Sequence, residues 1–160
     1  MNFLRGHCML EQGSLAASNR TGLTGSPGPR LLVVEDDTLH RMLICRVAAN
    51  AGYVPAGAST FDEAAKLLQK NVFDCITLDL SLGARDGDEV LRHLAANSSN
   101  THVIIVSGCD DSRRQESVAL AKSLGLNVWE SIAKPVDLVV LRYWLERLKS
   151  EYVAAAAVAA

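Results

Sequence analysis

The chain has 160 residues, which is room for one domain of ordinary size or for one domain with a loose end. Hydrophobic residues make up 49% of it, which is typical of a globular core and excludes a disordered chain. A formal net charge of −2 excludes a bulk electrostatic attraction to nucleic acid. We therefore expect one globular domain that has no direct nucleic-acid partner.

The cysteines and histidines do not indicate a metal site. The 4 cysteines form no Cys-x-x-Cys pair, and the 4 histidines are equally scattered. A membrane span is not expected, because no apolar run reaches about 18 residues. The first residues also lack the apolar region and cleavage site of a signal peptide. These features predict a cytoplasmic protein.

The two ends of the chain differ from its middle. Residues 1–29 are rich in Gly, Ser and Pro and show no apolar period, so we interpret them as a flexible leader. Residues 153–160 form a low-complexity tail whose alanines favour extension of the preceding helix. The expected domain covers residues 30–152.

The first elements alternate between strand and helix patterns. Residues 31–34 form a continuous apolar run, as in a strand buried on both faces. Residues 38–50 have a helical period, and residues 54–58 suggest a second strand. The apolar stripe expected on the first helix consists of Leu39, Leu43 and Val47.

The alternation continues to the end of the domain. The sequence Thr60-Phe-Asp-Glu63 is a capping box that opens a helix through Leu68, and residues 73–78 follow as a third strand. The remaining predicted elements, alternately helix and strand, are 87–96, 103–106, 112–124, 127–132 and 137–152. This order predicts an α/β fold, a parallel five-stranded (βα)₅ sheet with helices on both faces.

Polar side chains follow four of the predicted strands. They are Glu35 and Asp36, Asp79, Ser107, and Lys134. Because parallel strands end at one edge of their sheet, we expect these groups to converge there. An all-oxygen carboxylate cluster favours Mg²⁺ or Ca²⁺ over Zn²⁺, and a hydroxyl and an ammonium suit a phosphoryl group. Asp79 is the expected nucleophile, whereas Asp37 is interpreted as a helix cap.

The segments LLVVEDD, ITLDLSLGARDG, IIVSG and AKPVD resemble the receiver domain of two-component response regulators. The resemblance covers about residues 30–150. It implies a doubly wound sheet with the flavodoxin-like strand order 2-1-3-4-5. It also implies an aspartyl phosphate on Asp79, with Ser107 and Lys134 beside it and a cis bond before Pro135. The implied Mg²⁺ ligands are Asp36, Asp79, the backbone carbonyl of Ser81, and Glu35 through a water molecule.

The resemblance implies a bacterial phosphorelay protein rather than a dedicated enzyme, one that hydrolyses its own phosphoryl group slowly. Its expected partners are a sensor histidine kinase or a histidine phosphotransfer protein. A downstream protein, or a second copy of the chain, would dock on the face formed by 112–124, 127–132 and 137–152. A stand-alone receiver and a piece of a longer protein both fit this length.

Three alternatives differ in what the phosphoryl group does. A phosphate sink and a phosphorylation-independent adaptor stay open, although the intact acidic and lysine set argues against the adaptor. An aspartate-nucleophile phosphohydrolase is disfavoured, because Ser81 stands where such enzymes have a second aspartate.

Two residues depart from the family pattern. Gly83 replaces the usual proline after the phosphoacceptor, and Ser131 replaces the usual aromatic residue before the lysine. Trp129 lies on the same strand face as Ser131 if no bulge intervenes, so it either substitutes for the aromatic residue or belongs to the core.

The last predicted helix has two apolar sets. Leu138, Leu141, Leu145 and Leu148 form a stripe expected to pack on the sheet. Val140 and Trp144 lie off that stripe. Either they form an exposed interface patch, or they pack on the neighbouring helix or the tail.

Overall fold

The computed structural model describes residues 28–97 and 100–158, which form one parallel five-stranded sheet with helices on both faces. Its strand order is β2-β1-β3-β6-β7. The strands are β1 (Arg30–Val34), β2 (Val54–Ala58), β3 (Cys75–Leu78), β6 (His102–Ser107) and β7 (Asn127–Ala133). The predicted fold class and the order 2-1-3-4-5 are therefore confirmed.

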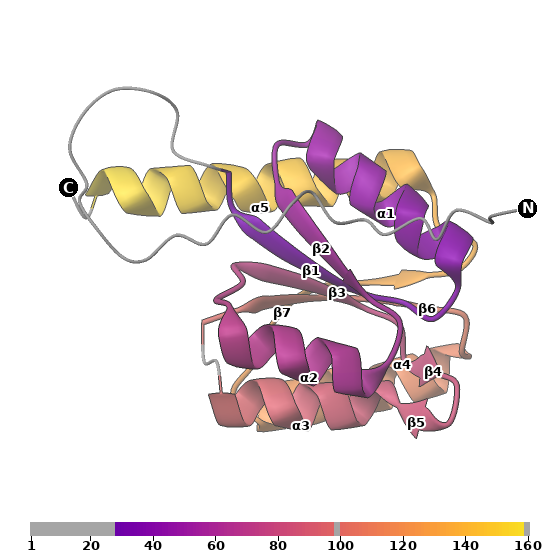
Figure 1. Ribbon diagram of the computed structural model, residues 1–160. Coiled ribbons are helices and arrows are strands. Elements are labelled where there is room, and N and C mark those ends of the chain that lie inside the picture. The colour runs from indigo at the N-terminus through magenta and orange to yellow at the C-terminus, as the bar shows by residue number, and fades with distance from the viewer. Residues whose placement is uncertain (1–27, 98–99, 159–160) are drawn as a thin grey trace, which may run out of the picture.

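The helices cover the two faces of the sheet unequally (Figure 1). One face carries α1 (Thr38–Asn50) and α5 (Leu138–Val158), and the other carries α2 (Phe61–Lys70), α3 (Gly87–Asn97) and α4 (Asp111–Ser123). Successive residues of β1 alternate between the two cores that result. Leu31 and Val33 belong to the core under α1 and α5, whereas Leu32 and Val34 belong to the other.

Side-chain caps begin the helices near the predicted positions. The Asp37 carboxylate accepts a hydrogen bond from the backbone N–H of His40 at 2.8 Å, so its interpretation as a cap is confirmed. Thr60 caps α2 by accepting from the N–H of Glu63, whose carboxylate accepts in return from the N–H of Ser59.

The apolar stripe predicted for α1 is wrong for two of its three residues, since only Val47 packs against the core. Leu39 is 64% exposed and Leu43 is also exposed, while Ile44, Cys45 and Ala48 are the buried residues. The helix has apolar side chains around most of its circumference, so its period did not identify the inner face.

A short hairpin after β3 was not predicted. It consists of β4 (Ser81–Leu82) and β5 (Arg85–Asp86), in which Ser81 pairs with Asp86. Gly83 lies in its turn with a φ of 63°, a backbone conformation that glycine adopts without strain. Gly83, which replaces the usual proline of the family, thus forms the turn of this hairpin.

A register shift in β7 separates Trp129 from Ser131. Val103 pairs with Val128 and Ile104 with Glu130, so Trp129 is the extra residue of the bulge. Trp129 packs on the core under α1 and α5, whereas Ser131 lines a groove beside α4. Trp129 therefore belongs to the core and does not replace the missing aromatic residue.

The last helix is longer than predicted and continues to Val158, as its alanine run favours. Leu141, Leu145 and Leu148 are fully buried, as their stripe predicts, and Leu138 is half-buried. Trp144 is half-buried against the same core and stacks edge-on against Tyr143.

Residues 1–27 of the expected leader, and 159–160 of the expected tail, lie outside the described residues. Within the described part of the chain, no helix combines the length and the apolar character needed to cross a membrane.

Gly87, the first residue of α3, allows a close backbone approach that can be tested. A Cβ at this position would lie 2.7 Å from the carbonyl oxygen of Asp79 and 2.7 Å from the Cα of Leu80. We expect Gly87→Ala to lower the free energy of unfolding by about 1–3 kcal/mol, because backbone must move. Urea unfolding measures this change.

Gly83→Asn is the matched control, since asparagine tolerates the left-handed conformation and no heavy atom lies within 4 Å of the added Cβ. It should change the free energy of unfolding by only about 0.5 kcal/mol. Equal effects of the two substitutions would contradict the close approach at Gly87.

Candidate functional site

The carboxyl ends of four parallel strands bring the sequence-predicted residues together. Glu35 and Asp36 follow β1, Asp79 follows β3, Ser107 ends β6, and Lys134 follows β7. The backbone fixes these positions across the sheet edge, since the N–H of Asp79 donates to the carbonyl of Val34 and that of Lys134 to Ser107. The Lys134–Pro135 peptide bond is cis, as the resemblance implies.

The carboxylate of Asp79 lies at the centre of the group and is only 4% exposed. Its Oδ2 accepts a hydrogen bond from Lys134 Nζ at 2.7 Å. Its Oδ1 accepts from Ser107 Oγ at 3.0 Å and from the backbone N–H of Ser81 at 3.0 Å. Both oxygens of this buried carboxylate are therefore partnered by groups that can also bind a phosphoryl oxygen.

Lys134 joins a second buried carboxylate to the first. Its Nζ lies 2.7 Å from Oε2 of Glu35, which is 1% exposed. Burial raises the pKa of Glu35, and the hydrogen bond and charge of Lys134 offset this only in part. Burial by itself would lower the pKa of Lys134, but its bonds to Asp79 and Glu35 outweigh burial and raise it. The ammonium is thus the main compensating charge of the site.

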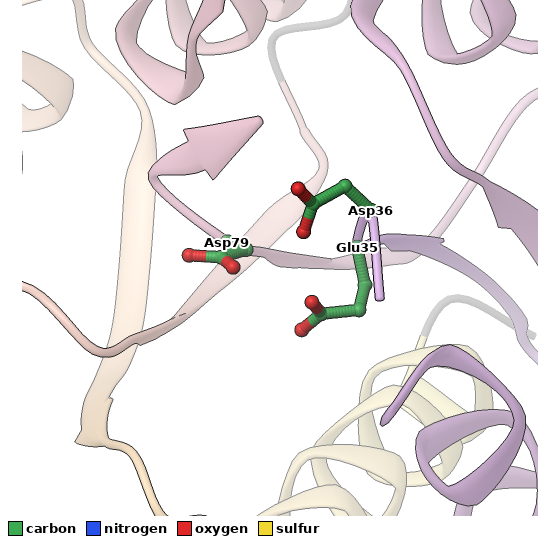
Figure 2. A group of neighbouring side chains, drawn as sticks. All are labelled: Glu35, Asp36 and Asp79. Carbon is green, nitrogen blue, oxygen red and sulfur yellow. The ribbon is translucent and has the colours of Figure 1, made fainter. Parts of the chain in front are cut away.

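Three carboxylates of this edge could share a cation. Glu35, Asp36 and Asp79 each offer an oxygen, and these atoms all lie within 4.8 Å of one another (Figure 2). Opposite ligands of an octahedral Mg²⁺ ion lie about 4.2 Å apart, so small side-chain movements bring the three oxygens to ligand distance. The donor set is all oxygen, and the residues present fit a hard divalent cation.

Sequence reasoning missed Arg41, which holds the loop that carries the acidic pair. Its Nη1 donates to the carbonyl oxygen of Glu35 at 2.6 Å and to that of Asp36 at 3.2 Å. The aliphatic part of Arg41 packs beside Gly57, where an added Cβ would lie 3.1 Å away. The sequence signal for this role was available: Arg41 is a cationic residue in the first turns of the helix that follows the acidic pair.

The chain thus forms an α/β domain whose parallel five-stranded sheet carries an acidic pair, a central aspartate and a lysine at its strand ends. The family model for the response regulator receiver domain matches residues 31–146. The chain belongs to this family. It is accordingly a receiver domain of two-component response regulators, and this family is one of signalling domains.

Individual relatives agree with this assignment. The regulatory protein VirG of Agrobacterium tumefaciens (strain 15955) is 31% identical over 127 residues, which cover 79% of this chain and 45% of VirG. The chain thus spans less than half of that relative's length.

Two solved structures are similar to the fold. A response regulator from Colwellia psychrerythraea is 32% identical, with a TM-score of 0.65 over 79% of this chain and 99% of its own. A response regulator protein from Burkholderia pseudomallei is 25% identical, with a TM-score of 0.64 over 81% of this chain and 74% of its own. That structure contains a phosphorylated aspartic acid, a calcium ion and citrate.

Removing the ammonium should expose the cost of the buried carboxylates. We expect Lys134→Met, which keeps the aliphatic stem, to lower the free energy of unfolding by about 3 kcal/mol near neutral pH, because Glu35 and Asp79 lose their shared cation. Mg²⁺ should restore part of this loss. Urea unfolding with and without Mg²⁺ measures both effects.

The sign of the pH dependence follows from the two raised pKa values. The stabilisation from charged Lys134 is full below its ordinary pKa of 10.5 and is lost as the pH rises through the raised value. At acidic pH, protonation of Glu35 below its raised pKa removes part of the need for compensation, so the difference between the variant and the wild type should become smaller. Lys149→Met is the control, because Lys149 Nζ donates to the Ala51 carbonyl. A pH-independent loss in Lys134→Met would contradict this account.

Proposed function

We propose that the chain is a phosphorylation switch that receives a phosphoryl group on Asp79, with Mg²⁺ bound beside it. The observation that carries the proposal is the buried Asp79 carboxylate, whose oxygens contact Lys134 Nζ at 2.7 Å and Ser107 Oγ at 3.0 Å. The phosphorylated aspartic acid and calcium ion of the Burkholderia relative support the same chemistry.

The proposed metal ligands are Asp36, Asp79, the backbone carbonyl of Ser81, and Glu35 through water. Asp36 is exposed and can turn toward an ion without loss of an existing buried contact. Mg²⁺ would supply positive charge next to the transferred group and so offset the repulsion between phosphoryl and carboxylate oxygens.

The transfer uses the residues of the site in fixed positions. An Asp79 oxygen attacks the phosphorus of a phosphohistidine, so that an O–P bond forms and the N–P bond breaks, and the histidine nitrogen keeps the electron pair. Lys134 and Ser107 now donate to Asp79, and both can redirect these hydrogen bonds to phosphoryl oxygens. Return of the phosphoryl group to water would be slow, because Ser81 stands where aspartate-nucleophile phosphohydrolases have a second aspartate as general acid.

The proposed donor is a sensor histidine kinase or a histidine phosphotransfer protein. Its histidine must reach Asp79, so the donor must cover the sheet edge around this residue. The exposed Leu39, Met42 and Leu43 lie on α1, which begins at that edge directly after Asp37. We assign this apolar surface, defined here as the α1 surface, to contact with the donor.

The proposed output face consists of α4, β7 and α5. Ser131 leaves a shallow groove of about 500 Å³ beside α4, lined also by Arg114 and Lys122. On α5, Val140 is exposed but Trp144 is half-buried, so the apolar patch is smaller than an exposed Val–Trp pair. A downstream protein or a second copy of the chain would dock here. A phosphate sink would share every contact of the site and differ only in its partners.

Phosphorylation of Asp79 can be tested directly. Treatment with acetyl phosphate and Mg²⁺ should add one phosphoryl group to the wild type, because Asp79 is the centrally placed carboxylate. Asp79→Asn should gain none, and chelation of Mg²⁺ should abolish the gain in the wild type. Intact-mass spectrometry measures the product. Asp37→Asn is the control, since asparagine also caps helices, and it should be phosphorylated normally. Equal labelling of Asp79→Asn would refute the assignment.

The α1 surface can be tested by charge insertion. Met42→Glu should leave labelling by acetyl phosphate unchanged, since Met42 is half exposed at 52% and the small-molecule donor needs no docking surface. Phosphoryl transfer from a phosphotransfer protein should slow at least about tenfold, because an apolar contact is lost. Val72→Glu, on a residue that is also exposed, is the control. If the phosphotransfer protein transfers its phosphoryl group to Met42→Glu and to Val72→Glu at the same rate, it does not dock on the α1 surface.

A further inference from the structure

Polar contacts hold much of helix α4 against the domain. Its buried residues are Ser117 and Ala121, both small, whereas α5 buries Leu141, Leu145 and Leu148. Little apolar area therefore fixes the position of α4 on the sheet. Polar side chains must contribute more to that position than they do for α5.

Arg113, in the first turn of α4, makes the main polar contacts. Its Nη2 donates to Asp86 Oδ1 at 2.7 Å, to Asp86 Oδ2 at 2.6 Å and to Asp88 Oδ2 at 3.0 Å. Its Nη1 donates to Ser117 Oγ at 2.6 Å, and this buried hydroxyl donates in turn to Asp88 Oδ1 at 2.7 Å. One guanidinium thus ties α4 to β5 and to the first turn of α3.

The same contacts lead back to the phosphorylation site. Asp86 pairs with Ser81 in the hairpin, and the N–H of Ser81 donates to Asp79 Oδ1 at 3.0 Å. Asp86 Oδ1 also accepts from the N–H of Asp88, which fixes the carboxylate that Arg113 grips. A continuous series of contacts therefore runs from Arg113 through Asp86 and Ser81 to Asp79.

We propose that Arg113 is a positioning residue that couples α4 to the hairpin loop carrying the Ser81 carbonyl. The inference rests on the proposed function, because it takes that carbonyl as a Mg²⁺ ligand. The hydrogen bonds from Arg113 to Asp86 fix β5 and, through their pairing, β4. The backbone carbonyl of Ser81 is then already in position to bind Mg²⁺. When the ion binds, the hairpin is fixed and α4 is held more firmly. Such coupling is reciprocal by thermodynamic necessity.

Mg²⁺ affinity and α4 mobility should consequently change together. In Arg113→Gln we expect Mg²⁺ to bind about fivefold more weakly, as measured by NMR titration of the full chain. In the wild type, Mg²⁺ with beryllofluoride should slow hydrogen exchange of α4 amides. In Arg113→Gln the α4 amides should exchange faster than in the wild type, and Mg²⁺ with beryllofluoride should no longer slow this exchange. Arg113→Lys, which keeps the charge but not the forked contact, should restore part of both effects.

Two further variants separate coupling from a general loss of stability. Arg85→Gln removes an arginine from the same hairpin, but Arg85 contacts Glu89 of α3 and not α4. It should leave Mg²⁺ affinity and the α4 response as in the wild type. The substitutions Arg113→Gln and Asp86→Asn break the same contact, so their effects on Mg²⁺ affinity should not add. The double variant should bind Mg²⁺ with about the affinity of whichever single variant binds it less tightly. Urea unfolding shows whether each variant is folded.

The outcomes are distinct. Wild-type Mg²⁺ affinity and a wild-type α4 response in folded Arg113→Gln would overturn the coupling while leaving the proposed function intact. Equal losses in Arg85→Gln would overturn it too, since they would point to a general effect of hairpin charge. A wild type that binds no Mg²⁺ and gains no phosphoryl group would instead reject the proposed function itself, and the coupling with it.

Discussion

The ammonium of Lys134 holds together two carboxylates that the fold has taken out of water. Glu35 and Asp79 are 1% and 4% exposed, and each lies 2.7 Å from Lys134 Nζ. Burial raises the pKa of Glu35, and the negative charge of Asp79 adds a smaller rise, so both effects favour the protonated form of Glu35. A single cation cannot fully neutralise the pair together with the nearby Asp36. The same surplus of negative charge that makes the site costly to fold therefore makes it a site for a divalent ion.

The sheet is what allows this arrangement to persist. Its central strands are buried on both faces, so hydrophobic packing fixes their register and hence the points where they end. The acidic pair, Asp79 and Ser107 lie at the ends of these central strands, whereas Lys134 follows the edge strand β7. The loops contribute smaller adjustments: Arg41 grips the carbonyls of the acidic pair, and the β4–β5 hairpin places Ser81 beside Asp79. The strands thus position the charged side chains of the site. The position of α4 depends instead on polar contacts, chiefly those of Arg113, which we propose to be coupled to the site.

Much of this could be predicted from the sequence because it follows from short-range patterns. Alternating strand and helix signals gave the parallel sheet, and polar residues at strand ends gave the grouping of Asp79, Ser107 and Lys134. The inner face of α1 could not be identified in this way, because apolar side chains surround that helix and only contact with the sheet selects Ile44, Cys45 and Ala48. The bulge at Trp129 and the Arg113–Asp86 contact depend on register and on segments far apart in the chain, which no local pattern encodes.

A crystal structure of the chain with Mg²⁺ and beryllofluoride would test the central claim most directly. The account predicts beryllium bonded to Asp79, with Mg²⁺ contacting Asp36, Asp79 and the carbonyl of Ser81. It also predicts that Lys134 and Ser107 turn from the Asp79 oxygens to the fluorine atoms, while Glu35 keeps its contact with Lys134. An ion bound away from these carboxylates, or a beryllofluoride-free Asp79 that keeps Lys134 and Ser107 unchanged, would contradict it.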